Sequence, residues 1–376
     1  MRLASFNVEN FFARPKAMNR ENWAEGRPVL AAHAELNTLL EEPTYTDAIK
    51  ARIVALLAVL GLTNSDSAAM AELRQIRGRL VRRPQGGGVE VIAAGRGSWV
   101  GWVDLTTEPV TEAAIANTAR VIRDLNPQVL GVVEAENRIV LAHFTDAQLR
   151  TRAAPDNPIH PMYPHVMLVD GNDDRGIDVA LLTQTGYPLG PMRSHVDDTD
   201  AQGIVFSRDC PEYELRTPGG HRLVVLVNHL KSKGYGSQAA NNARRLRQAQ
   251  RVADIYRQVR NSGVRYVAVL GDFNDTPDSA PLAPLLGGTD LRDISQHPAF
   301  DDGGRPGTFG SMTASNRIDY LLLSPALFAK ASGGGLYRMG AWGGTNGTLW
   351  PHYDTVTKPT DAASDHAAIY ADVNLA

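Results

Sequence analysis

The chain of 376 residues has one cysteine and almost no net charge. The single Cys210 excludes an intrachain disulfide framework and a zinc site built from cysteines, and it slightly favours a reducing compartment. The formal charge of -3 excludes a histone-like polycation, but not an enzyme that binds phosphates through a few local cations. Hydrophobic residues at 43% and charged residues at 21% exclude a chain that is disordered throughout.

Long apolar segments are also absent from the sequence. The longest apolar run, Ile53 to Leu62, is far shorter than the roughly 20 residues that a membrane-spanning helix needs. Ser5, Asn7 and Glu9 interrupt any secretory apolar segment near the start, so the sequence predicts a cytoplasmic protein, or a secreted one if the first residue is a processed end. At roughly 150 residues per domain, the length indicates two units or one large unit with an insertion.

Several short runs rich in valine, leucine and isoleucine are typical of strands. Continuous apolar runs of this length predict strands that are covered on both faces. The runs are Val129 to Val133, Ile177 to Leu182, Leu223 to Val227, Tyr266 to Leu270 and Ile318 to Leu323.

Helical patterns lie between these runs. Thr111 to Leu125 and Asn242 to Val259 each place apolar residues on one face at helical spacing. Turn residues at Thr217 to Gly220, directly before a strand, favour hairpins and largely antiparallel pairing. The sequence therefore predicts α/β or α+β layers.

Residues 13 to 110 differ from the rest of the chain, and we interpret them as an inserted subdomain. They contain a predicted helix at Thr46 to Leu60, which Gly61 ends, and a glycine turn at Gln85 to Gly88 between two β-like stretches. Trp99 and Trp102 have two interpretations: they form the core of the insertion, or they contact bases or lipid. The insertion also holds a dense group of arginines, namely Arg74, Arg77, Arg79, Arg82 and Arg83.

Polar residues that can bind metal or move protons follow the predicted strands. Strand ends on a rigid scaffold can direct such side chains at one cleft. Taken alone, each motif also fits a surface carboxylate, a turn cap or a structural histidine. The motifs are Ser5-Phe6-Asn7-Val8-Glu9-Asn10, Val132-Val133-Glu134-Ala135-Glu136-Asn137, Val227-Asn228-His229-Leu230-Lys231-Ser232-Lys233, Leu270-Gly271-Asp272-Phe273-Asn274-Asp275, and the pair Arg317-Ile318-Asp319-Tyr320 with Ser364-Asp365-His366.

In this order the motifs resemble those of the endonuclease/exonuclease/phosphatase superfamily, the Mg-dependent phosphoesterases related to deoxyribonuclease I and exonuclease III. The resemblance covers residues 1 to 12 and roughly 115 to 374, and Asn228 to Lys233 looks most like the branch of bacterial, often secreted, nucleases. It implies an α/β (α+β) fold, a four-layered αββα sandwich of two mainly antiparallel sheets flanked by helices. One such domain would span residues 1 to 376, interrupted by the helical and β-hairpin insertion at 13 to 110.

The resemblance also implies a metal site. Glu134 matches the principal ligand, Asp365 completes the shell, and Asn7 supports metal and phosphate. Glu9 occupies a position where the family often has an acidic ligand, although a purely structural role for it stays open. Oxygen ligands of this kind suit Mg²⁺ or Mn²⁺ rather than zinc.

The resemblance assigns proton transfer and the orientation of water and phosphate to other residues. His366 and Asp319 resemble the family's histidine-aspartate dyad, with His366 as general base. Asp272 and Asn274 resemble the pair that orients the attacking water and a phosphate oxygen. His229 matches a second histidine that stabilises phosphate charge or protonates the leaving oxygen.

Several cations are candidates for substrate binding. Arg175 precedes a strand and could meet a phosphate, or pair with a neighbouring aspartate. Lys231 and Lys233 could contact a polymer backbone or be solvated loop lysines. The helix at 241 to 260 holds six arginines, which fits either a nucleic-acid contact or a solvated face.

We therefore expect a divalent-metal-dependent phosphodiester hydrolase, first of all a nuclease that cleaves DNA or RNA. One alternative keeps the chemistry and changes the substrate, as in a phosphatase or phospholipid phosphodiesterase; an exposed hairpin carrying both tryptophans would favour lipid. A non-catalytic binding module would require a missing catalytic residue, and none is missing from the motifs.

Overall fold

The structure, a computed structural model, describes residues 1–9, 13–17, 23–151, 160–173, 176–233 and 237–375. The chain divides into two compact units, one made of residues 1–12, 110–232 and 241–376, the other of residues 13–109 and 233–240. Within the described ranges, no helix is both long and apolar enough to cross a membrane.

The first unit contains two large sheets, each built mainly from antiparallel pairs. The first sheet has one parallel pair at its centre, β1 with β8, and another at its edge, β20 with β22. Its strands, in spatial order, are β11 (His165–Leu168), β12 (Asp178–Thr183), β8 (Val129–Ala135), β1 (Arg2–Asn7), β23 (Ala368–Val373), β22 (Ala331–Tyr337) and β20 (Phe300–Asp301).

The second sheet has six strands and one parallel pair, β17 with β18, again near its centre. The turn at Thr217 to Gly220 joins β16 to β17 as an antiparallel hairpin, which confirms the sequence prediction there. The strands, in spatial order, are β13 (Leu189–Arg193), β16 (Glu212–Arg216), β17 (Arg222–His229), β18 (Tyr266–Asp272), β21 (Asp319–Leu323) and β19 (Arg292–Asp293).

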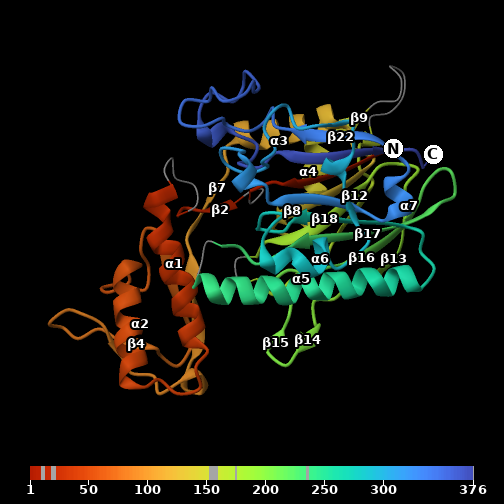
Figure 1. Cartoon of the computed structure of the whole chain (residues 1–376). Coiled ribbons are helices and arrows are strands. Elements are labelled where there is room, and N and C mark those ends of the chain that lie inside the picture. Colours follow the sequence, from red (N-terminus) through yellow and green to blue (C-terminus); the bar gives the residue numbers. More distant parts are fainter. Residues whose placement is uncertain (10–12, 18–22, 152–159, 174–175, 234–236, 376) are drawn as a thin grey trace. The chain divides into compact units, whose positions relative to one another are not determined.

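Helices cover the outer face of each sheet. Figure 1 shows α3 and α4 beside the sheet that contains β8, and α5 beside the sheet that contains β17 and β18. Three clusters of buried apolar residues match these layers, one between the two sheets and one under the helices on each side. The fold prediction of an αββα sandwich is thus confirmed. The helices of this unit are α3 (Glu112–Leu125), α4 (Arg138–Gln148), α5 (Gln238–Asn261), α6 (Ala283–Leu286) and α7 (Pro325–Phe328).

The sequence explains why the layers form. Val129, Val133, Leu223 and Leu270 are fully buried between the sheets, because strands with helices on one side and a second sheet on the other need apolar residues on both faces. Gly131 permits the close approach of the sheets, since a Cβ there would lie 2.2 Å from Cδ1 of Leu270.

The ends of α3 follow the rules of helix capping. Thr111 precedes the helix, and its side chain accepts a hydrogen bond from the backbone N–H of Ala114 at 3.1 Å. Asn126 ends the helix in the left-handed conformation, directly before Pro127.

The first unit also contains two short antiparallel pairs, β9 (Arg150–Thr151) with β10 (His160–Pro161), and β14 (Thr199–Asp200) with β15 (Gly203–Ile204).

The second unit has its own apolar core, formed by two helices and small hairpins. Trp99 is buried in this core, where its indole N–H donates a 2.9 Å hydrogen bond to the hydroxyl of Tyr45. Trp102, by contrast, is exposed, so the two tryptophans take different roles. The elements are α1 (Trp23–Leu40), α2 (Asp47–Val59), and the antiparallel pairs β2 (Ala13–Pro15) with β7 (Thr107–Pro109), β3 (Ala71–Arg77) with β6 (Val100–Leu105), and β4 (Val81–Arg82) with β5 (Glu90–Val91).

Candidate functional site

The two central parallel pairs bring the polar motifs to common strand ends. Asn7 is the direct neighbour of Val133 across β1 and β8, so Glu9, two residues beyond β1, and Glu134, next to last in β8, lie at the same edge. His229 is the direct neighbour of Asp272 across β17 and β18. Because parallel strands end on the same side, motifs far apart in sequence meet there.

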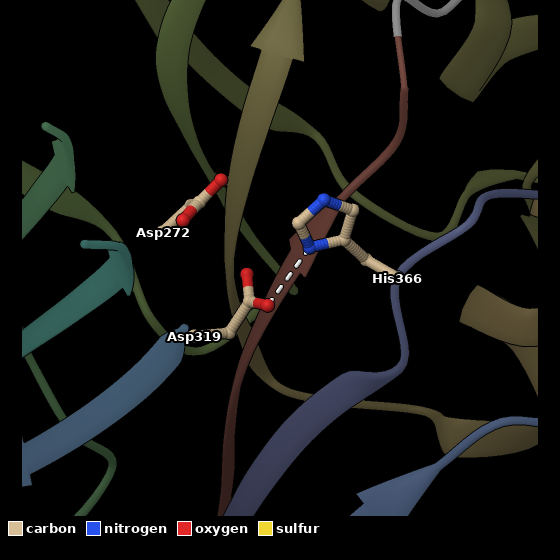
Figure 2. A group of neighbouring side chains, drawn as sticks. All are labelled: Asp272, Asp319 and His366. Carbon is tan, nitrogen blue, oxygen red and sulfur yellow. Dashed lines mark hydrogen bonds and ion pairs between the residues drawn. The ribbon is translucent and has the colours of Figure 1, made fainter. Parts of the chain in front are cut away.

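Asp319 and His366 form a buried, hydrogen-bonded dyad. Asp319 is the cross-strand neighbour of Asp272, and its Oδ2 lies 2.8 Å from Nδ1 of His366. Figure 2 shows the second ring nitrogen of His366 on the side away from Asp319. The Oγ1 of Thr308 accepts a 3.0 Å hydrogen bond from the backbone N–H of Asp319, and the ring of Phe309 lies 4.8 Å from the imidazole. The carboxylate and the aromatic ring together fix the orientation of the imidazole.

Ser364 fastens the segment that carries this histidine to strand β1. Its hydroxyl donates to the backbone oxygen of Asn7 at 2.7 Å and accepts from the backbone N–H of His366 at 3.0 Å. A carboxylate oxygen of Glu9 accepts from the backbone N–H of Asp365 at 3.0 Å. Glu9 therefore has a structural contact within the site.

His229 lies between two of the predicted site carboxylates. Its Nε2 is 3.7 Å from Oε1 of Glu134 and 3.7 Å from Oδ2 of Asp272. The same Asp272 oxygen accepts a 3.2 Å hydrogen bond from the side-chain amide of Asn7. Residues of both sheets thus contribute to one buried cluster.

The loop after β18 is closed by Asp272 and Asn274. Asp272 Oδ1 accepts a 2.8 Å hydrogen bond from the backbone N–H of Asn274, whose side-chain amide donates to the backbone oxygen of Leu230 at 3.1 Å. The preceding Gly271 has φ of 131°, and a Cβ there would lie 1.9 Å from the backbone oxygen of Asn228. Only glycine fits this close approach of the two catalytic strands.

Three predicted site residues have left-handed backbone conformations. Glu9, Glu134 and Asn274 have φ of 51°, 68° and 56°, and only two other non-glycine residues in the described part of the chain have positive φ. Such conformations cost about 1–2 kcal/mol for residues with a Cβ and concentrate at functional sites. Glu134 also lies where the register of β8 against β12 shifts, between Val133 and Ala135.

The crowding of carboxylates shifts the titration of the cluster. Burial raises the pKa of Asp272 well above its usual range, and the negative charge of Asp319 adds to this rise. Burial alone would lower the pKa of His366, but the charge and hydrogen bond of Asp319, followed by the charges of Asp365 and Asp272, raise it well above the ordinary value. An excess of negative charge around one small region favours a bound cation.

Three donors lie close enough together to hold a metal ion. Asp272, Asp319 and His366 each offer a ligand atom, and these atoms lie within 4.8 Å of one another. In that trio, however, Asp319 and His366 already satisfy each other at 2.8 Å. Glu134 and Asp365, which the resemblance assigns to the metal, are both partly exposed carboxylates.

Of the predicted substrate-binding cations, only Lys231 lies in the described part of the first unit. Arg175 lies outside the described residues, and the exposed Lys233 falls in the second compact unit. The backbone of Lys231 is held by α5, because its N–H donates to Oε1 of Gln248 at 2.7 Å.

The arginines of α5 correct one expectation. Arg247 and Arg251 pair with Asp200 and Asp198, and Arg257 pairs with Asp254. Arg260 donates to backbone oxygens at 2.8 and 2.9 Å. These arginines are paired with neighbouring groups rather than forming a free basic stripe, which weakens the argument for a nucleic-acid contact along α5.

Arg245 is a site-supporting residue that the sequence reasoning missed. It is fully buried, and its Nε donates to Oδ2 of Asp275 at 2.9 Å. It also donates to the backbone oxygen of Lys231 and to Oδ1 of Asn242. Arg245 thereby joins the loop after His229 to the loop after Asp272.

The fold and site define a class of enzyme, the metal-assisted phosphoesterases with a histidine-aspartate dyad. Residues 109–366 match the family model described as the endonuclease/exonuclease/phosphatase family. The chain belongs to this family and is a metal-dependent phosphoesterase. The predicted family and enzyme class are confirmed.

Solved structures with a similar arrangement are distant in sequence. A family member from Bacteroides vulgatus is 17% identical, with 69% of this chain and 91% of that chain covered and a TM-score of 0.48. A truncated TDP2 from Caenorhabditis elegans is 17% identical, with 69% and 90% covered and a TM-score of 0.47. The human Nocturnin catalytic domain with a bound sulfate is 14% identical, with 70% and 86% covered and a TM-score of 0.47. No curated protein matches the chain.

Proposed function

We propose that the protein is a nuclease that hydrolyses phosphodiester bonds with a divalent cation, Mg²⁺ or Mn²⁺. The observation that carries the proposal is the pair of histidines with different surroundings in one cluster. His366 is held by Asp319 at 2.8 Å, whereas His229 lies 3.7 Å from both Glu134 and Asp272. One histidine can accept a proton while the other donates one.

His366 acts as the general base. Its Nδ1 faces Asp319, so Nε2 is the nitrogen that can take a proton from the attacking water. The Asp319 carboxylate stabilises the charged imidazole that results. Asp272 and Asn274, fixed by their mutual hydrogen bond, orient the water and a phosphate oxygen.

Glu134, Asp365 and Glu9 would hold the metal ion, with Asn7 in support. A divalent cation in such a site neutralises phosphate charge and assists the ionisation of water. Asn7 and Glu9 are linked through the 3.0 Å hydrogen bond from the Glu9 backbone N–H to Oδ1 of Asn7, which keeps the amide and the carboxylate in a fixed relation.

His229 serves the leaving group. A phosphodiester expels an alkoxide, which needs a proton or strong charge stabilisation as the bond breaks. His229 is almost fully buried at the end of β17, and its Nε2, 3.7 Å from carboxylate oxygens of Glu134 and Asp272, is the nitrogen that would donate to the leaving oxygen.

A phosphatase or phospholipid phosphodiesterase is the second candidate. The exposure of Trp102 favours a lipid contact, but Trp99 is buried in the core of the second unit, so the tryptophans do not form a common exposed hairpin tip. This difference weakens the case for a lipid substrate.

The test compares plasmid DNA, single-stranded DNA, RNA, a nitrophenyl phosphodiester and a phosphomonoester, each with Mg²⁺ or Mn²⁺. We expect cleavage of at least one nucleic acid, loss of activity in excess EDTA, and a roughly 10²- to 10⁴-fold loss in His366→Ala. Hydrolysis of the monoester without cleavage of any nucleic acid would contradict the proposal.

A further inference from the structure

The second unit presents an outward face that its own core does not use. Strands β3 and β6 pair so that Arg74 is opposite Trp102 and Arg77 is opposite Val100. Residues that alternate along a strand share one side of the sheet, and the buried Leu73 and Val103 occupy the inner side. Arg74, Arg77, Val100 and Trp102 therefore share the outer side, which we call the outer hairpin face.

This face exposes apolar surface. Ile76, in the bulge beside Arg77, is 64% exposed, Val100 is 46% exposed and Trp102 is 44% exposed. Val100 and Trp102 share one side of β6, and exposed apolar residues that lie together in this way are typical of an interaction surface. The tryptophan ring is also held in place, because its indole N–H donates to Oδ1 of Asp104 at 2.7 Å.

The charged side chains around the face that have no ion-pair partner in the described part of the chain are arginines. Arg74 pairs with Glu72 at 2.9 Å and with Asp104 at 3.1 Å, so it contributes little net charge. Within the described residues, neither Arg77 nor Arg79 has an ion pair, and both side chains are exposed. Arg77 shares the face with the oriented indole, and Arg79 follows two residues later in the chain, so the exposed guanidinium groups match a ligand with anionic groups and flat rings.

We infer that the outer hairpin face binds single-stranded nucleic acid, with a base stacked on Trp102 and phosphates at Arg77 and Arg79. An aromatic residue on a sheet with flanking cations is suited to unstacked bases, because every base offers a flat face to the ring. In a duplex the bases stack on one another, so their faces are not available to the indole. The inference rests on the proposed nuclease function and specifies the class of its substrate.

A lipid surface fits the same face less well. Trp102 lies within strand β6 rather than at the tip of a loop, so its ring cannot project beyond its neighbours into a membrane interface.

The test measures anisotropy of a labelled oligothymidylate bound to the full chain in EDTA, where no cleavage occurs. We expect Trp102→Ala to weaken binding roughly 5- to 150-fold, the range that stacking on one ring supplies, and Trp102→Phe to retain most of the affinity. The double variant Arg77→Ala/Arg79→Ala should reduce the slope of log affinity against log salt by about 1.4, because each phosphate contact on a single strand contributes about 0.7.

Arg82→Ala is the matched control, since Arg82 is an exposed arginine of the same unit that already pairs with Glu90 at 2.6 Å. It should leave both affinity and salt slope unchanged. The inference is overturned if the wild-type chain binds no oligothymidylate, if Trp102→Ala binds as the wild type does, or if Trp102 matters only for phosphatidylserine vesicles.

The outcomes separate this inference from the proposed function. Trp102-dependent binding of the oligonucleotide, with no cleavage of any nucleic acid in Mg²⁺ or Mn²⁺, would contradict the nuclease and sustain the binding face. Cleavage of nucleic acid, together with oligonucleotide binding that does not change in Trp102→Ala, would sustain the nuclease and contradict the binding face.

Discussion

Replacement of Arg245 by methionine should destabilise the protein severely, although the six arginines of its helix also fit a solvent-exposed basic surface in the sequence. The guanidinium is fully buried and lies 2.8 Å from Oδ2 of Asp275, which is itself almost completely buried. Removal of one partner of a buried ion pair costs roughly 3–5 kcal/mol, because the remaining charge loses its compensation. We expect a loss of this size in the free energy of unfolding of Arg245→Met.

The assay is urea unfolding followed by circular dichroism, with Arg247→Met as the matched control. Arg247 is two residues further along α5 and pairs with Asp200, but both partners are partly exposed. Surface pairs contribute roughly 0–1 kcal/mol, so the control should remain within about 1 kcal/mol of the wild type. The double variant Arg245→Met/Asp275→Leu should be more stable than Arg245→Met alone.

Activity gives a second readout of the same residue. Arg245 joins the backbone oxygen of Lys231 to Asp275, and these loops follow His229 and Asp272. A variant that is folded at low temperature should therefore show a lower kcat. If Arg245→Met were as stable as Arg247→Met, the buried pair would not have the role that we assign to it.

Three further predictions concern the buried Asp178 and the site residues Glu134, His229 and His366. Burial raises the pKa of Asp178 to about 7, above that of the unfolded chain, so the folded state binds this proton more tightly. Stability should then fall between about pH 4 and pH 7, by up to about 4 kcal/mol, and urea unfolding at pH 5 and pH 8 should show a weaker pH dependence in Asp178→Asn; an identical dependence would contradict this. Glu134→Gly should abolish turnover yet unfold at the same or a higher urea concentration, because glycine relieves a φ of 68°, and a clear loss of stability would count against strain there. His229→Ala should lose roughly 10²- to 10⁴-fold on DNA but much less on a nitrophenyl ester, whereas His366→Ala should lose activity on both; equal losses of His229→Ala on the two substrates would refute its role with the leaving group.

Much of the first unit could be predicted from the sequence because its strands are covered on both faces. Tyr266 to Leu270 and Leu223 to Val227 are continuous apolar runs, and the structure places them in β18 and β17. The polar residues that end these runs, His229 and Asp272, are cross-strand neighbours. The apolar runs therefore also locate the site, because each of these strands supplies core residues along its length and a site residue at its end.

The roles of individual cations could not be predicted from composition. A helix with six arginines looks the same in sequence whether a guanidinium faces water or a buried carboxylate. The partner that decides, Asp275, lies 30 residues away from Arg245 and meets it only in the folded chain. Long-range pairing of this kind leaves no local periodicity.

The second unit was the least predictable region. Helix α1 contains Pro28 and Gly26, which both argue against a helix, and a Cβ at Gly26 would lie 1.6 Å from the backbone oxygen of Ala17. The glycine is thus explained by a tertiary contact that the sequence does not reveal. Trp99 and Trp102 differ in exposure because one turns into the core and the other lies on the outer side of β6.

Calorimetric titration of Mn²⁺ into the wild type, Glu134→Gln and Asp319→Asn tests the central claim most directly. The claim is that carboxylates at the ends of β1 and β8 bind the metal, whereas Asp319 serves His366 through their 2.8 Å hydrogen bond. We predict that Glu134→Gln weakens Mn²⁺ binding by at least about tenfold and that Asp319→Asn changes it by less than about threefold while activity is lost. Loss of Mn²⁺ binding in Asp319→Asn, with binding intact in Glu134→Gln, would place the metal at Asp272, Asp319 and His366 and contradict this account.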